Sequence, residues 1–323
     1  MKLLLLSVLF FLLLLVSPSA SCNSNDEKAL LQIKKSLNYP PLLSSWTPKT
    51  DCCTNWTGVE CTRRRVTSLT VSNGNISGEI SPAIGGLPFL RTLDFSFLSH
   101  LTGSIPRTIT NLKHLDTLRL RNTDLSGPIP DFISELKEVT FLDLSFNRFS
   151  GSIPGSLSQM PKIEAIQIND NKLTGSIPES FGSFVGNVPN LYLMNNRLSG
   201  NIPQSLSKYD FNAVDLTGNG FTGDGSMFFG RNKTTVRVNL SRNKFHFDLT
   251  KVKLGKSLLS LDLSHNQIYG KLPAGLTSLK LDYFDVSFNR LCGRIPQGGK
   301  LQTFKPSAYS HNLCLCGPPL KGC

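Results

Sequence analysis

The sequence predicts an α/β solenoid, in which repeats of about 24 residues wind into a right-handed superhelix with a parallel sheet on its concave face. Two observations lead to this fold class. All eight cysteines lie towards the two ends of the chain. Between them, asparagines recur at spacings of 24, 25, 23, 24, 23 and 23 residues, at Asn147, Asn171, Asn196, Asn219, Asn243, Asn266 and Asn289. A repetitive middle between cysteine-rich ends is typical of a solenoid with capped ends.

Each regular repeat contains the pattern L-x-L-x-x-N-x-L, as in residues 142–149 and 261–268. In L-x-L the two apolar side chains point to the same side of a short strand, and the residue between them points to the other side. Stacked strands therefore bury a column of leucines and display the x residues on the concave face. The asparagine amide can bond backbone groups of neighbouring turns that would otherwise be buried without partners.

Three degenerate copies precede the regular repeats and begin at Leu69, Leu93 and Leu118. Their asparagine position holds Gly74, is displaced by one extra residue, or holds Thr123. With these copies we expect ten repeats over residues 66–293. A repeat cannot bury its own apolar edge, so we expect a cysteine-containing cap at residues 22–65 and another at 294–323.

A second element follows most of the asparagines and reads Leu/Phe-Ser/Thr-Gly-x-Ile-Pro, as in residues 149–154 and 173–178. The glycine permits a turn with positive φ, and the proline ends the next extended piece because it has no N–H donor. Repeats seven and eight lose this element, after Gly223 and Phe247. The Gly-x-Ile-Pro form resembles the plant extracellular subtype of leucine-rich repeat.

The first 21 residues have the order of a secretory signal peptide: a basic start, an apolar run over residues 3–16 and small residues before Cys22. We expect cleavage after Ser21 and a secreted, extracellular protein. The apolar run is shorter than the roughly 20 residues that a membrane helix needs. No later stretch has that length and apolarity, so we expect no transmembrane segment.

The cysteines of an exported chain with an even cysteine count are expected to form disulfides. A metal site at the close pair in the tail is the alternative, but no histidine or second close pair completes a tetrahedral set there. We therefore expect neither metal nor cofactor. The predicted disulfide residues are Cys22, Cys52, Cys53, Cys61, Cys292, Cys314, Cys316 and Cys323.

Four Asn-X-Ser/Thr sequons predict N-glycosylation, at Asn55, Asn75, Asn232 and Asn239. Of these, Asn239 falls on the predicted concave face, where a glycan would crowd a binding partner. Either this site is unmodified or its repeat lies outside the contact.

The two ends of the chain carry a more specific resemblance. The segments Asp51-Cys-Cys53 and Gly58-Val-Glu-Cys61, with Trp56 between them, look like the plant N-terminal cap. The tail, over residues 291–304 and 314–320, resembles that of the polygalacturonase-inhibiting proteins. The resemblance implies four disulfides: Cys22–Cys52, Cys53–Cys61, Cys292–Cys314 and Cys316–Cys323.

This family resemblance implies a protein of the plant cell wall that binds fungal or insect endopolygalacturonases and limits the breakdown of pectin. Relatives of the same type include floral developmental proteins and a cold-responsive antifreeze form. The alternative is therefore a developmental or receptor-associated protein that binds an endogenous plant partner, such as a receptor, without inhibiting an enzyme. Thr217-Gly218, which stands where many inhibitors have Ser-Arg, keeps this alternative open.

The predicted concave face is acidic, with nine acidic residues against five arginines, a net charge of −4 on a chain of net charge +12. One interpretation is that its Asp-Leu-Ser segments are inert repeat consensus. The other is that the acids steer a basic enzyme towards aromatic anchors, among them Tyr283 and Phe288. The predicted partner-binding residues are Asp94, Phe97, Arg119, Arg121, Phe141, Asp143, Phe146, Gln167, Asp170, Tyr192, Asp215 and Asp262.

Basic residues away from this face predict a second surface. In an exported protein these residues favour an acidic polysaccharide such as pectin, and not nucleic acid, as the ligand. A solvated surface that binds no ligand is an equally good interpretation of them. The candidates for binding pectin or polygalacturonate are Arg63, Arg64, Arg65, Arg231 and Lys233.

Residues for catalysis are not apparent. The five histidines are scattered, and the serines belong to the repeat consensus without a nucleophile elbow. Concave carboxylates could imitate a glycosidase pair, but the repeat accounts for them. We therefore expect a binding protein and not an enzyme.

Overall fold

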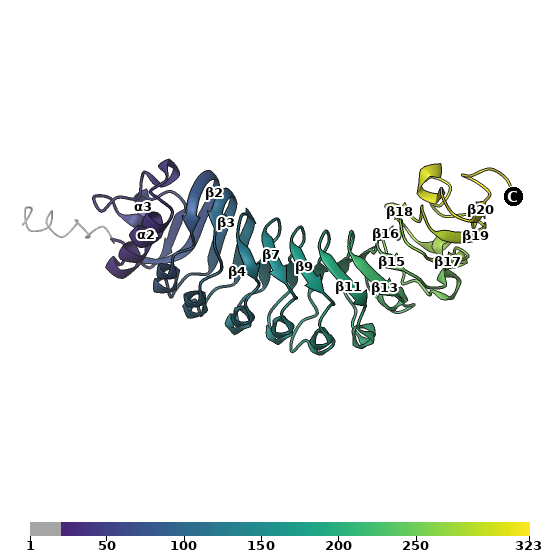
Figure 1. Ribbon diagram of the computed structural model, residues 1–323, viewed down its shortest axis with the longest axis horizontal. Coiled ribbons are helices and arrows are strands. Elements are labelled where there is room, and N and C mark those ends of the chain that lie inside the picture. The colour runs from purple at the N-terminus through teal and green to yellow at the C-terminus, as the bar shows by residue number, and fades with distance from the viewer. Residues whose placement is uncertain (1–20) are drawn as a thin grey trace, which may run out of the picture.

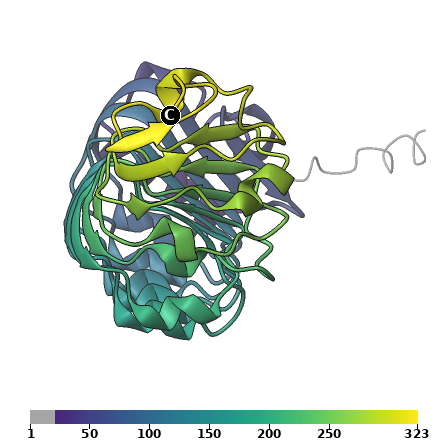
Figure 2. The ribbon, with the colours of Figure 1, turned by 90° about the vertical axis from the view of Figure 1, so that its right-hand side faces the viewer.

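The computed structural model describes residues 21–323, which form a single curved, right-handed solenoid with a cap at each end (Figure 1). Almost all of the expected signal peptide lies outside the described residues. Within them, no helix combines the length and apolarity needed to cross a membrane. Seen along the solenoid, the coils stack behind one another and the short helices gather along one edge (Figure 2).

An eleven-stranded sheet lines the concave side, and all its neighbours are parallel except the first pair, β1 and β2. This confirms the predicted parallel concave sheet. Its strands, in spatial order, are β1 (Val59–Thr62), β2 (Arg65–Glu79), β3 (Thr92–Thr102), β4 (Thr117–Thr123), β6 (Phe141–Asp143), β8 (Ala165–Gln167), β10 (Asn190–Tyr192), β12 (Ala213–Asp215), β14 (Arg237–Asn239), β16 (Ser260–Asp262) and β18 (Tyr283–Asp285).

A second sheet of six parallel strands runs beside the first, where the Gly-x-Ile-Pro elements lie. Its strands are β5 (Ser126–Pro128), β7 (Arg148–Gly151), β9 (Lys172–Gly175), β11 (Arg197–Asn201), β13 (Gly220–Gly223) and β15 (Lys244–Phe245). A third sheet at the C-terminal end contains β17 (Tyr269–Gly270), β19 (Arg290–Arg294) and β20 (Cys314–Cys316).

Short 3-10 helices form the convex side (Figure 1). Several begin directly after the proline of the Gly-x-Ile-Pro element, as at Pro154 and Pro178, because proline fixes an extended entry. On the convex side they span Pro82–Gly86, Arg107–Asn111, Asp131–Glu135, Gly155–Gln159, Glu179–Ser183, Gln204–Lys208, Ser226–Phe228, Leu249–Lys251 and Ala274–Ser278. Two more, Pro41–Leu43 and Pro306–Tyr309, belong to the terminal caps, and the second lies beside β18.

The core lies between the concave sheet and the convex helices and runs the length of the solenoid. In a typical repeat, Leu142 and Leu144 of the L-x-L strand are fully buried, together with Phe149 after the asparagine. Neighbouring repeats bury the matching side chains, so the apolar faces cover one another and only the end repeats need caps.

The N-terminal cap covers the first repeat with helices α2 (Ser24–Ser36) and α3 (Cys52–Asn55). The side chain of Asn23 caps α2 by accepting from the N–H of Asn25, and Leu30 and Ile33 of α2 are buried. Trp46 and Trp56 stack with their ring centroids 5.5 Å apart.

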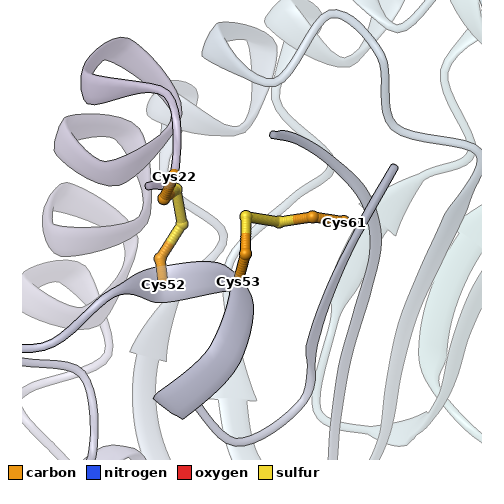
Figure 3. A group of neighbouring side chains, drawn as sticks. All are labelled: Cys22, Cys52, Cys53 and Cys61. Carbon is orange, nitrogen blue, oxygen red and sulfur yellow. A yellow bond between two sulfur atoms is a disulfide. The ribbon is translucent and has the colours of Figure 1, made fainter. Parts of the chain in front are cut away.

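The cap cysteines are joined as Cys22–Cys52 and Cys53–Cys61 (Figure 3). Their four sulfur atoms lie within 4.8 Å of one another, a spacing that would also suit a metal ion. Because each sulfur is already bonded in a disulfide, it is not a thiolate ligand. At the other end the disulfides are Cys292–Cys314 and Cys316–Cys323. These pairings are the ones that the family resemblance implied.

The recurring asparagines form a hydrogen-bonded ladder, which confirms their predicted role. The side chain of Asn147 donates to the carbonyls of Leu144 in its own turn and Leu120 in the preceding repeat, at 3.1 and 2.6 Å. One repeat later, Asn171 Oδ1 accepts from the N–H of Phe149 at 2.9 Å. The ladder continues into the C-terminal cap through Asn312, which the repeat pattern alone did not include.

The first three repeats have no asparagine ladder and instead use long strands. β2 and β3 pair along nearly their whole length, and Gly74 pairs with Leu98, which in turn pairs with Thr123 of β4. Leu98, a fully buried residue, thus holds the position that the sequence left displaced by an extra residue. Backbone pairing between neighbouring strands satisfies most of the groups that the asparagines satisfy later in the chain. In the third repeat the hydroxyl of Thr123 accepts the N–H of Leu125 and donates to Asn147 Oδ1.

Candidate partner-binding surface

The residues between the two leucines of each repeat form a single row across the concave sheet. Strand register places Asp94 beside Arg119, Arg119 beside Asp143, and Asp143 beside Gln167. Tyr192 and Asp215 continue the row, which ends with Asp262 and Asp285. The other predicted contacts, Phe97, Arg121, Phe141, Phe146 and Asp170, flank this row on the same strands or directly after them.

Most acids of this row are bound to their own strand ends. In the Asp-Leu-Ser segment of Asp262 the carboxylate accepts the backbone N–H two residues later at 2.9 Å, and Asp285 does the same at 2.8 Å in an Asp-Val-Ser segment. Asp215 accepts the N–H of Thr217 in the same way at 3.0 Å. These bonds turn the chain out of the strand, so the acids have a local structural role whether or not a partner binds.

Asp143 was predicted to contact a partner directly, and this prediction is wrong, because Asp143 is only 1% exposed. Its carboxylate accepts the N–H and hydroxyl of Ser145, and the guanidinium of Arg119 lies beside it. Arg119 lies 2.8 Å from Asp94 Oδ2 and 3.7 Å from Asp143 Oδ2. The carboxylate of Asp143 is therefore covered and cannot serve as a direct contact, whereas Asp94 and Arg119 remain half-exposed.

Arg121 lies between two exposed aromatic rings that come from the repeats on either side of it. The guanidinium carbon is 5.3 Å from the ring centroid of Phe97 and 5.5 Å from that of Phe146, which is within cation–π range. The two phenylalanines are 44% and 41% exposed. We call Phe97, Arg121 and Phe146 the arginine clamp.

Both phenylalanines of the clamp have a left-handed backbone, with φ of 57° for Phe97 and 55° for Phe146. This position directly precedes the asparagine position of the repeat, and other repeats place Asn122, Asn195 or Gly218 there. Asparagine and glycine tolerate positive φ, whereas a bulky residue costs about 1 kcal/mol. Such strain at an exposed aromatic side chain is typical of a functional surface.

The same position carries a second ring cluster near the C-terminal end. Phe288 stacks between His265 and His311, and both centroid separations are 4.1 Å. The sequence indicated Phe288 as an anchor but missed the two histidines. Both histidines directly precede an asparagine of the ladder, as Phe288 does, and this spacing could have indicated them. We call these three residues the ring stack.

Beside the ring stack, the hydroxyl of Tyr283 donates to Asp262 Oδ2 at 3.3 Å. Burial, followed by the nearby Asp285, raises the pKa of Asp262 above its ordinary value. Burial together with both carboxylates raises the pKa of Tyr283 to about 12. At this end of the face Asp262 and Asp285 therefore lie close together, beside the neutral phenol of Tyr283.

The middle of the face is smoother than its ends. Gly218 has a φ of 67°, and an added Cβ would lie 2.5 Å from Asn195 Oδ1, so a side chain at this position would require the Asn195 side chain to shift. Asn239 uses both ends of its amide, donating to Asp215 Oδ2 at 3.3 Å and accepting from the hydroxyl of Ser241 at 2.8 Å.

The other three sequons, Asn55, Asn75 and Asn232, are exposed. Because the Asn239 amide is half-buried and fully engaged, we expect this sequon to be unmodified and the glycans to lie off the concave face.

The predicted pectin-binding residues fall into two separate places. Arg63 and Arg64 are exposed in the turn between β1 and β2, where both have positive φ. Arg65 is partly committed to structure, because it pairs with the buried Asp26 at 2.8 Å and lies 4.1 Å over the ring of Phe89. Arg231 is far along the solenoid, between the 3-10 helix Ser226–Phe228 and β14.

Lys233 corrects a second expectation. Its ammonium donates to the carbonyls of Ser207 and Tyr209 in the preceding repeat. Burial of the side chain lowers its pKa, in spite of the nearby Asp210. The cation is therefore occupied by the fold and is not free for a polysaccharide.

Arg231 lines a cavity of about 570 Å³ at the repeats that lack the Gly-x-Ile-Pro element. Lys251, Lys253, His246 and Tyr269 also line it, and the rings of His246 and Tyr269 lie 4.8 Å apart. Asp224 and Asp248 line it as well, so the loss of the repeat consensus opens an aromatic hollow with three cations and two acids beside the solenoid.

The geometry defines a leucine-rich-repeat protein with capped ends and an open concave face. Residues 23–62 match the family described as "Leucine rich repeat N-terminal domain", and residues 138–160, 162–184 and 257–279 match "Leucine Rich Repeat".

Three comparisons place the chain more narrowly. It is 75% identical to "Leucine-rich repeat protein FLOR 1" of Arabidopsis thaliana over 98% of both chains. It is 60% identical to "Polygalacturonase inhibitor" of Vitis vinifera, over 100% of this chain and 98% of that one. Its structure matches the crystal structure of a plant ice-binding protein with a TM-score of 0.91 and 45% identity, over 94% and 98% of the two chains. The chain belongs to the polygalacturonase-inhibitor family of leucine-rich-repeat proteins.

Proposed function

We propose that this protein is a secreted protein of the plant cell wall that binds a fungal or insect endopolygalacturonase through its concave face and inhibits it. The observation that carries the proposal is the arginine clamp: two strained, exposed aromatic side chains held beside a cation on an open sheet. Rigid aromatic and arginine residues are the side chains that dominate protein interfaces. Full-length similarity to a polygalacturonase inhibitor indicates the kind of partner.

The proposed mechanism is occlusion and not chemistry. At about 4.8 Å per strand, ten parallel strands span about 43 Å, which is enough for an interface of standard size. Half-exposed acids such as Asp94, Asp170 and Asp215 would steer a basic enzyme, and the clamp would supply affinity once it docks. Asp143 would support this surface from beneath Arg119.

Inhibition is tested with the purified glycoprotein against a panel of fungal and insect endopolygalacturonases, following the release of reducing ends from polygalacturonate. The test variant is Phe146→Asn, because asparagine keeps the left-handed backbone and removes only the ring. Phe89→Asn is the matched control, since Phe89 is 43% exposed but lies outside the concave face. Equal inhibition by Phe146→Asn and the wild type would remove the clamp from the interface.

Retention in the wall is a further part of the proposal. Arg63 and Arg64 at one end and the cavity around Arg231 at the other would hold the protein on pectin by charge. Salt should then elute the protein from immobilised polygalacturonate, and Arg231→Gln should lower the salt concentration that is needed. Elution that does not depend on salt would count against this binding mode.

A second candidate is binding to an endogenous plant protein, such as a receptor, without inhibition. Its support is the 75% identity over 98% of both chains to FLOR 1, a name that states no inhibitory activity. Gly218, which leaves the middle of the face without a side chain, also fits a partner other than the usual enzyme. No inhibition across the panel, with photo-crosslinking from position 146 to one extracellular plant protein, would favour this candidate.

A further inference from the structure

We infer that Arg121 is a receptor for a single carboxylate of a polypeptide partner. The inference rests on the proposed binding role of the concave face and gives the chemistry that this face recognises. It does not depend on whether the partner is an endopolygalacturonase.

The first observation is a break in the repeat at this strand. Where neighbouring repeats read Asp94-Phe-Ser96 and Asp143-Leu-Ser145, β4 reads Arg119-Leu-Arg121. Strand register places Arg121 beside Ser96. The equivalent residues elsewhere are all uncharged: Ser72, Ser96, Ser145, Asn169, Met194, Thr217, Ser241, Ser264 and Ser287.

The second observation is that only one of the two arginines is matched by the fold. Arg119 lies between Asp94 and Asp143 and pairs with both. Among the described residues, none accepts a hydrogen bond from Arg121, and no acid lies within ion-pair distance of it. Its Nε is buried without a partner. Because Nε is not accessible from solvent, a ligand would contact the terminal nitrogens of the guanidinium, which are not buried.

The third observation is that the unmatched cation is held in place. Phe97 and Phe146 flank it at 5.3 and 5.5 Å, from the position before the asparagine position, where the repeats have a positive φ. The rings restrict the motion of the guanidinium, so less conformational freedom is lost when its remaining N–H groups bind a ligand. Arg121 is thus oriented for a group that the chain itself does not supply.

A carboxylate is the group that fits this arrangement. The planar fork of the guanidinium matches the two oxygens of a carboxylate, and the exposed phenyl rings favour apolar groups next to it. The same face carries carboxylates of its own, Asp170 and the paired Asp94 and Asp116. A polyuronate, with one charge on each sugar, would be repelled there. We therefore assign the site to one acidic side chain in an otherwise neutral segment of polypeptide.

The test follows the Arg121 Nε–Hε resonance of isotope-labelled protein by NMR during titration. The probes are N-acetyl-Leu-Glu-Leu-amide, the same tripeptide with glutamine, and trigalacturonate. We expect the glutamate tripeptide to shift this resonance, and the glutamine tripeptide and trigalacturonate to bind at least tenfold more weakly. Arg121→Gln should lower the affinity for the glutamate tripeptide at least tenfold. Arg242 is another exposed arginine of this face, and Arg242→Gln should change that affinity less than twofold.

Equal binding of the glutamate and glutamine tripeptides, or no shift with either, would overturn the carboxylate assignment. Binding of trigalacturonate as tight as that of the glutamate tripeptide would overturn the assignment to a polypeptide. The ladder asparagine side-chain resonances report whether each variant is folded. Because no enzyme is present, the titration is independent of inhibition: inhibition without tripeptide binding rejects this inference alone, and tripeptide binding without inhibition rejects only the enzyme as partner.

Discussion

The two ends of the concave face place aromatic rings at the same position of the repeat, directly before the asparagine position, but they use them differently. At the N-terminal end Phe97 and Phe146 flank Arg121, which has no acid partner among the described residues. At the C-terminal end Phe288 stacks on His265 and His311, so the rings satisfy one another. The first cluster is prepared for an external group, and the second is largely complete by itself.

The backbone beneath the two ends explains the difference. In the C-terminal repeats the asparagine ladder and the Asp-Leu-Ser segments fix most positions after the strand. In the first three repeats the long pairing of β2, β3 and β4 satisfies the backbone instead. Residues near the strand end are then free to vary, and Arg119-Leu-Arg121 replaces the consensus there.

The largest expected effect concerns the ladder itself. Asn243→Ala should lower the free energy of unfolding by about 3 kcal/mol, because the carbonyl of Leu216 and the N–H of Phe221 are left buried without partners. Thr123→Ala, at the same position in the strand-paired region, should cost about 1 kcal/mol. Urea denaturation measures both. Equal losses would show that the two regions do not differ in how they satisfy the backbone.

The next effect separates binding from stability at the two ring clusters. Phe146→Asn should weaken the binding of an inhibited polygalacturonase by about 2 kcal/mol, and Phe288→Asn should weaken it by less than half of that. Both variants should unfold at the same or slightly higher denaturant concentration, because asparagine relieves the strain of a positive φ. Inhibition constants measure the change in binding, and urea midpoints on the same samples measure the change in stability. A larger loss of inhibition in Phe288→Asn would reverse the comparison.

The smallest effect is a pH dependence at the C-terminal end. The folded pKa of Asp262 is raised by burial, so its contribution to stability is fully present below the unfolded pKa and is lost as the pH rises through the folded pKa. Asp262→Asn should remove this decline, since Asn239 already accepts the backbone N–H in the same way one repeat earlier. Urea midpoints between pH 3 and pH 7 test this. An unchanged pH profile in the variant would exclude Asp262 as the cause.

The solenoid could be predicted from the sequence because the repeat reports its own register: each Asn147-like residue implies a strand before it and a turn after it. Gly74 and the extra residue before Leu101 carried no such signal, because whether a strand continues depends on its neighbour. The disulfide pairing came from family resemblance alone, since spacing does not determine which cysteines meet.

The site was less predictable, because its properties arise between repeats. Asp143 was expected to be exposed, but Arg119 from the neighbouring strand covers it. Lys233 was expected to be free, but it reaches carbonyls of the repeat before it. Conversely, the sequence placed Arg121, Phe97 and Phe146 on the correct face but could not show that two rings flank one unmatched cation. Lateral contacts between repeats are absent from the pattern of a single repeat.

The most direct test of the concave face as the binding surface is the dissociation constant of an inhibited endopolygalacturonase for Arg121→Gln and Arg242→Gln. We expect Arg121→Gln to weaken binding at least tenfold, because it removes the unmatched cation of the arginine clamp. Arg242→Gln, in the C-terminal half of the same face, should change binding less than twofold. Equal losses in the two variants, or no loss in Arg121→Gln, would contradict the assignment of binding to the N-terminal end of the face.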